Sequence, residues 1–149
     1  MAVFESRTEL SCTPERLFEF IIRPANLKVI APAEVGLSFV DAPEVIALGS
    51  KLVFKVQGFG VVQHLEHEIV EFDPPRGFRE RMVKGPLPHW QHEYILEPDA
   101  AGGVTLLNRI EFEPPGGILG MILTAERMID HLHREYQHRS EALKQALST

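Results

Sequence analysis

Seven histidines stand out in this 149-residue chain, and four of them form the pairs His64/His67 and His89/His92. Imidazole is a common ligand for zinc and related metals, so each pair suggests a metal site. Both pairs, however, lie in runs that alternate with the two-residue period of a β-strand. Side chains three positions apart on a strand point to opposite faces, so neither pair can share a metal ion locally. We therefore expect no metal ion, and no other cofactor is indicated.

Acid–base chemistry suits these histidines better, because one carboxylate is expected to lie beside an imidazole. Between residues 78 and 113 the chain alternates apolar and polar residues and turns at short Gly- and Pro-containing loops, which predicts antiparallel hairpins. With the more apolar positions facing inward, Glu80 lies opposite His92 or Tyr94, and so does Asn108. Directly opposed Cβ atoms are about 4.5–5.5 Å apart. A buried carboxylate facing an imidazole shifts both pKa values, as is typical of functional sites.

This polar cluster has three interpretations. Its members could be structural hydrogen-bond partners, as buried polar side chains commonly are. They could orient a ligand in a cavity. They could also catalyse a reaction, with Glu80 and His92 as an acid–base pair and Tyr94 or Asn108 stabilising an oxyanion. The spacing alone does not choose among them.

The order of the predicted elements indicates one α+β domain over residues 1–149. Thr13 is a suitable N-cap and Pro14 suits the first helical position, so a short helix follows the first strand. A second short helix begins at Pro24. Gly58-Phe59-Gly60 is read as a turn between two strands. The expected elements are a strand at 3–10, helices at 14–23 and 24–30, strands at 35–39, 52–56, 61–72, 78–84, 89–97 and 104–113, and a helix at 118–147.

The terminal helix is expected to cover the apolar face of the sheet. Its apolar residues recur every three or four positions, which is the pattern of an amphipathic helix. His133 lies near this stripe and is a candidate to close a cavity, whereas Glu135 and Arg139 are assigned to the outer, solvated face.

Composition excludes several classes of function. The formal charge is −6, which argues against nucleic-acid binding or adsorption to anionic membranes. A single cysteine, Cys12, cannot form an internal disulfide, which fits a reducing cytoplasm. No apolar run reaches membrane-spanning length and no signal-peptide pattern is visible, so a cytoplasmic protein without membrane insertion is expected. The sequence contains no nucleophile elbow and no Gly-rich phosphate-binding loop.

Several short motifs resemble one known group of proteins. They are Cys12-Thr13-Pro14-Glu15-Arg16-Leu17-Phe18, Arg23-Pro24-Ala25-Asn26-Leu27, Glu71-Phe72-Asp73-Pro74-Pro75, Lys84-Gly85-Pro86, Trp90-Gln91-His92 and Asn108-Arg109-Ile110-Glu111-Phe112. Together with the element order they resemble the START-like helix-grip superfamily (SRPBCC) of polyketide cyclases, pollen allergens and lipid-transfer domains. Asn108 stands where similar sequences often carry Asp.

The resemblance implies a twisted antiparallel sheet of six to seven strands wrapped around a long C-terminal helix, with two short helices after the first strand. It also implies a cavity between sheet and helix, with residues 115–120 near its mouth. Trp90 and Phe59 could cover a ligand there. The expected cavity residues are Phe54, Gln63, His67, Met82, Trp90, Tyr94, Asn108, Ile110, Ile122, Ile129 and His133, beside the candidate catalytic pair Glu80 and His92.

Three functions follow as hypotheses. The first is binding of a small hydrophobic or aromatic molecule in this cavity. The second is a cyclase- or dehydratase-type enzyme that uses the Glu80–His92 pair. The third is a protein-interaction or chaperone-like module that uses a sheet edge or an exposed apolar patch. A homodimer is compatible with each of them.

Overall fold

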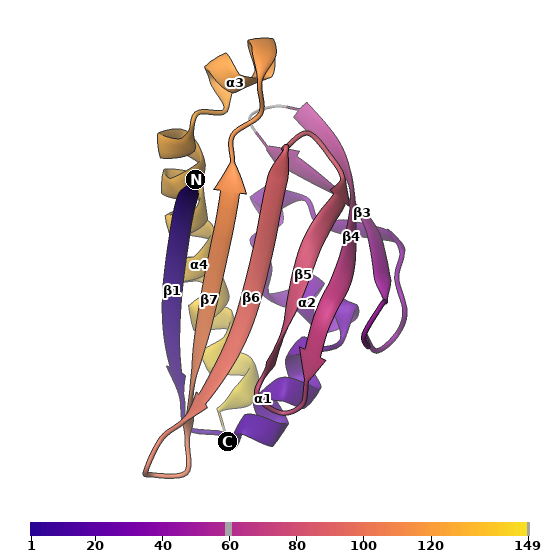
Figure 1. Ribbon diagram of the computed structural model, residues 1–149. Helices are drawn as coiled ribbons and strands as arrows, with labels where there is room; N and C mark the ends of the chain where they lie inside the picture. The colour runs from indigo at the N-terminus through magenta and orange to yellow at the C-terminus, as the bar shows by residue number, and fades with distance from the viewer. Residues whose placement is uncertain (59–60, 149) are drawn as a thin grey trace.

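A single seven-stranded antiparallel sheet wraps around a long helix in the computed structural model, which describes residues 1–58 and 61–148 (Figure 1). The strands follow the order β1-β7-β6-β5-β4-β3-β2, so every neighbouring pair except β1 and β7 is consecutive in the chain. The strands are β1 (Ala2–Leu10), β2 (Ser38–Asp41), β3 (Lys51–Gly58), β4 (Val61–Asp73), β5 (Gly77–Lys84), β6 (His89–Pro98) and β7 (Val104–Glu113). This is the predicted α+β helix-grip architecture.

Two short helices, α1 (Pro14–Ile21) and α2 (Pro24–Ile30), follow β1 as predicted. The Thr13 hydroxyl accepts a hydrogen bond from the backbone N–H of Arg16, and proline occupies the first turn of both helices. The apolar side of α1 is fully buried in the main hydrophobic core, as Leu17 shows at 0% exposed. These helices lie behind the lower part of the sheet in Figure 1.

The terminal helical region differs from the prediction of one continuous helix. It consists of α3 (Gly117–Ile122) and α4 (Ala125–Leu147), which are separated at Leu123 and Thr124. Thr124 caps α4 by accepting a hydrogen bond from the backbone N–H of Arg127. Because an N-cap residue has an extended backbone, α3 cannot continue through Thr124 into α4. Helix α4 lies behind β1 and β7, whereas α3 projects beyond the end of the sheet (Figure 1).

The strand expected at 35–39 also begins later than predicted. Residues Ala33–Val35 form a 3₁₀ turn, η1, and β2 starts at Ser38. Gly36 adopts a left-handed conformation (φ 61°), which ends the turn and delays the strand. The predicted turn at Gly58-Phe59-Gly60 falls partly outside the described residues.

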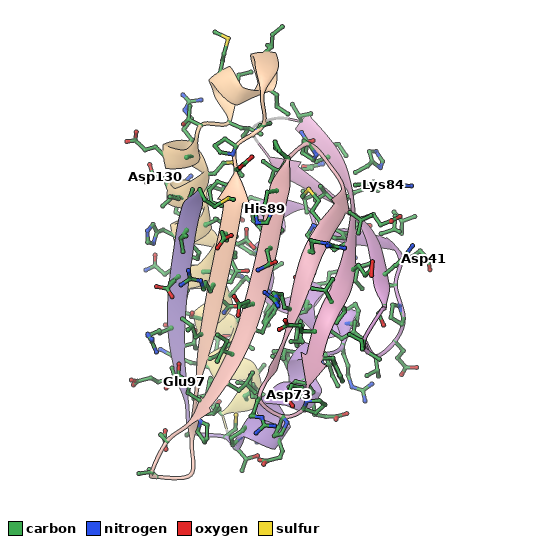
Figure 2. All side chains as sticks on the ribbon, viewed as in Figure 1. Asp41, Asp73, Lys84, His89, Glu97 and Asp130 are labelled. Atoms are coloured by element: carbon green, nitrogen blue, oxygen red, sulfur yellow. The ribbon has the colours of Figure 1, made fainter. Side chains whose placement is uncertain are left out.

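The core lies between the concave face of the sheet and the helices, in two clusters. The larger cluster joins α1 and α2 to the middle strands and the end of α4, and the smaller one joins β1, β7 and the start of α4. Charged residues such as Asp73, Glu97 and Asp130 lie on the outside of this layered structure (Figure 2). No helix within the described residues is both long and apolar enough to span a membrane.

Candidate ligand cavity

A cavity of about 230 Å³ opens between the concave face of the sheet and α4. Its walls are largely apolar, and α2, η1, strands β2 to β6 and α4 all contribute to them. Eight of the residues predicted from the sequence line it, namely Phe54, Gln63, His67, Glu80, Met82, Trp90, His92 and Tyr94.

Glu80 lies between two imidazoles in the wall of this cavity. The hairpin of β5 and β6 pairs Glu80 directly with His92, one of the two registers expected from the sequence. His92 Nδ1 lies 3.4 Å from Glu80 Oε1, and His67 Nδ1 of β4 lies 3.2 Å from Glu80 Oε2. The Tyr94 hydroxyl, 3.5 Å from Oε1, donates a third and longer hydrogen bond. A carboxylate is therefore held by groups from β4 and β6.

These contacts fix the charge state of Glu80. Burial on its own raises the pKa of a carboxyl group, but hydrogen bonds and charge interactions with His67 and His92 outweigh it and hold the pKa of Glu80 well below its ordinary value of 4.5. Glu80 is thus an ionised hydrogen-bond acceptor at neutral pH. Its residue exposure is 8% and those of both histidines are lower.

Asn108 and Tyr94 position His92 from the β7 and β6 sides. His92 Nε2 lies 2.8 Å from Asn108 Oδ1. Tyr94 pairs with Asn108 across the strands, again one of the two expected registers. The ring of Tyr94 stacks between His92 (4.0 Å between centroids) and Phe78 (4.3 Å). Asn108 itself lies behind the cavity wall, in a small adjoining pocket.

Helix α4 contributes a second polar group that the sequence analysis missed. Tyr136, Glu135 and Arg139 line the cavity, although Glu135 and Arg139 had been assigned to the outer face, and that assignment was wrong. The Arg139 guanidinium lies 4.6 Å from the centroid of the Tyr136 ring, donates to its hydroxyl (3.1 Å) and pairs with Glu135 (3.2 Å). The i,i+3 and i,i+4 spacings from Tyr136 and Glu135 to Arg139 were the available signal.

Burial dominates the protonation of the aromatic hydroxyls. It raises the pKa of Tyr94 and that of Tyr136 above the ordinary value of 10.0, so both stay protonated at neutral pH. The Tyr94 hydroxyl donates its proton to Glu80, whereas the Tyr136 hydroxyl accepts from Arg139 and remains able to donate.

Five of the predicted cavity residues lie elsewhere. Besides Asn108, Ile110 is fully buried in the smaller core cluster, and Ile129 packs against that cluster. Ile122 is 45% exposed on α3, because the break at Thr124 separates it from the face of α4. His133 is exposed and turns its ring edge toward Phe4 of β1, at 5.0 Å. His131, two residues earlier, lines the cavity in its place.

Two buried nitrogens in the cavity-lining residues have no hydrogen-bond partner. They are Nε2 of His67 and Nε1 of Trp90. Buried polar atoms are nearly always paired, so an unpaired one suggests a partner that is absent from the protein alone. Phe59, the other aromatic residue predicted to cover a ligand, lies outside the described residues. Among the residues that are described, no cluster of His, Cys, Asp or Glu has a geometry that could hold a metal ion.

A long helix gripped by a curved antiparallel sheet, with a largely apolar cavity between them, defines a helix-grip protein. The sequence profile of the family described as "Polyketide cyclase / dehydrase and lipid transport" matches residues 1–148. The chain therefore belongs to this family, as the motifs had suggested. No curated protein sequence gives a significant match.

Solved structures with the same fold have distant sequences. Protein CV1439 from Chromobacterium violaceum has a TM-score of 0.76 at 15% identity, covering 100% of this chain and 99% of that one. TTHA0849 from Thermus thermophilus has a TM-score of 0.73 at 13% identity and covers 99% of both chains. The Aha1 dimer from Colwellia psychrerythraea has a TM-score of 0.67 at 14% identity, covering 99% of this chain and 96% of that one. At such identities the likeness shows the fold alone.

Proposed function

We propose that this protein binds a small hydrophobic or aromatic molecule in the cavity between the sheet and α4. The observation that carries the proposal is an apolar cavity of about 230 Å³ with a few polar groups in its wall, which is the usual composition of a small-molecule site. The unpaired nitrogens of His67 and Trp90 support it, because a bound molecule could supply their partners. The lipid-transport description of the family is consistent with an apolar ligand.

Native mass spectrometry of freshly purified protein tests this proposal. A bound small molecule is expected as an added mass that disappears on denaturation. Val56→Phe, which places a larger side chain into the cavity lining, should abolish the added mass. Val62→Phe is the matched control, because Val62 is 49% exposed and outside the lining. Protein that is always empty, and that takes up no apolar compound on incubation, would overturn the proposal.

Catalysis is a second candidate, favoured by one specific observation: Glu80 lies within 3.4 Å of two imidazole nitrogens. Because Glu80 is ionised and its lowered pKa makes it a weak base, it would stabilise an imidazolium while the histidines transfer the proton. The compound recovered from the purified protein would be incubated with fresh protein and followed by mass spectrometry. Turnover that Glu80→Gln abolishes, with retained binding, would support catalysis. If the compound is unchanged after incubation, ligand binding is the only function supported.

A further inference from the structure

The carboxylate of Glu80 presents a hydrogen-bond acceptor to the cavity. An ionised carboxylate accepts and cannot donate, and it has about four lone-pair sites. His67, His92 and Tyr94 occupy three sides of Glu80, and 11% of its side chain remains exposed. Because Glu80 belongs to the cavity lining, a donor from a bound molecule can reach the remaining site.

His67 holds one side of the Glu80 carboxylate. Its Nδ1 faces Glu80 Oε2 at 3.2 Å and donates the hydrogen bond that the carboxylate accepts. The side chain of His67 is only 6% exposed, so this contact stays within the wall of the cavity.

Fixed positive charge in the cavity is already neutralised. Among the described residues of the lining, Arg139 is the only arginine or lysine, and Glu135 and the Tyr136 hydroxyl bind it. His131 Nε2 lies 3.9 Å from the same Glu135 carboxylate. The titratable groups that interact with Glu80 are His67 from β4, His92 and Tyr94 from β6, and Tyr136 from α4. A carboxylate ligand would meet Glu80 with no uncommitted Arg or Lys to offset the repulsion.

We infer that the cavity selects uncharged apolar molecules that carry at least one O–H or N–H donor, and discriminates against carboxylates such as fatty acids. The apolar walls bind the body of the molecule, and the Glu80 carboxylate binds its donor group. This selectivity rests on the proposed function, since it concerns the same cavity.

Three probes of the same ring system test the inference by isothermal titration calorimetry. 2-Naphthol carries a donor, 2-methoxynaphthalene is uncharged without a donor, and 2-naphthoate is anionic. A hydrogen bond to a charged group is expected to favour 2-naphthol over the methoxy compound by at least tenfold in Kd. 2-Naphthoate should bind more weakly than either.

The outcomes separate the two proposals. If none of the three probes binds, the proposed function fails for aromatic ligands of this size, and the inference fails with it. If all three bind with similar Kd, or 2-naphthoate binds most tightly, the cavity is a binding site but the donor selectivity is refuted.

A charge-removing variant provides the second measurement. In Glu80→Gln the preference for 2-naphthol over 2-methoxynaphthalene should shrink at least threefold, and 2-naphthoate should gain affinity. Met82→Leu is the control, because Met82 lines the apolar wall and its change should alter the three Kd values together. Thermal unfolding of both variants confirms that they are folded. An unchanged probe preference in folded Glu80→Gln would refute the role of Glu80.

Discussion

The charge of Glu80 leads to a prediction about stability that can be worked out from the structure. Glu80→Gln keeps the shape of the side chain and removes its charge. Two hydrogen bonds from imidazoles then lose their charge-assisted character, which costs about 1 kcal/mol or more each, and relief of the buried charge offsets part of that cost. We expect the variant to be destabilised by about 1–3 kcal/mol at pH 7.

The pH dependence follows from the lowered pKa. A group whose pKa is lower in the folded state contributes stability above its unfolded pKa, and this stability is lost as pH falls toward the folded value. With an unfolded pKa of 4.5 and a folded one far lower, the Glu80 contribution decreases by about 0.8 kcal/mol at pH 4 and about 2 kcal/mol at pH 3. The difference in the free energy of unfolding between wild type and Glu80→Gln should therefore shrink by these amounts.

Urea unfolding at pH 7, 5, 4 and 3 measures this difference. Glu97→Gln serves as the control, because Glu97 also lies on β6 but forms an exposed pair with Arg7 (3.5 Å). An exposed pair contributes about 0–1 kcal/mol, so the control should show little change. A difference for Glu80→Gln that is constant from pH 7 to pH 3, or that grows as pH falls, would refute the assignment of Glu80 as an ionised, imidazole-bound carboxylate.

Other positions give simpler expectations, all measurable by urea unfolding at neutral pH. Thr124→Ala removes the N-cap of α4 and should cost about 0.5–2 kcal/mol; no measurable loss would mean that the cap does not stabilise the helix start. Gly77→Ala should lower the free energy of unfolding more than Gly49→Ala does. Both glycines have positive φ, but only at Gly77 would a Cβ collide with a backbone carbonyl of β6. Equal costs would contradict that reasoning. Ile69→Ala, at a fully buried position, should cost about 2–5 kcal/mol, whereas Ile118→Ala, at an 82% exposed one, should change stability by less than about 0.5 kcal/mol. Similar losses at both sites would show that α3 packs against something in solution.

The sheet and its polar cluster could be predicted because strand parity and short hairpins constrain each other. Once the apolar positions of β5, β6 and β7 face inward, a slip of one residue would expose all of them, so Glu80 had to lie near His92. The same reasoning predicted opposite faces for His64 and His67, and His64 is exposed whereas His67 is buried. The choice between His92 and Tyr94 as direct partners needed the loop geometry, which the sequence leaves open.

The helix side of the cavity was harder to predict, because a long polar side chain can lie on either side of an amphipathic stripe. Arg139 was assigned to solvent on the basis of its charge, yet contacts with Tyr136 and Glu135 hold it against the cavity. These contacts depend on how α4 is rotated about its axis. The helix starts anew after Thr124, so a single helical period drawn across residues 118–147 does not give this rotation. The same rotation brings His131 to the cavity and turns His133 toward Phe4.

The pairing of β1 with β7 also affects how the chain can fold during synthesis. Strands β2 to β7 pair with sequence neighbours and can form hairpins as they emerge, whereas β1 has no strand partner until residues 104–113 have been made. At about 5–20 residues per second, Phe4, Thr8 and Leu10, all nearly fully buried in the finished protein, would wait on the order of 5–20 s for that partner. The first strand is therefore the segment most in need of protection in the nascent chain, and the sheet is complete only after its last strand has left the ribosome.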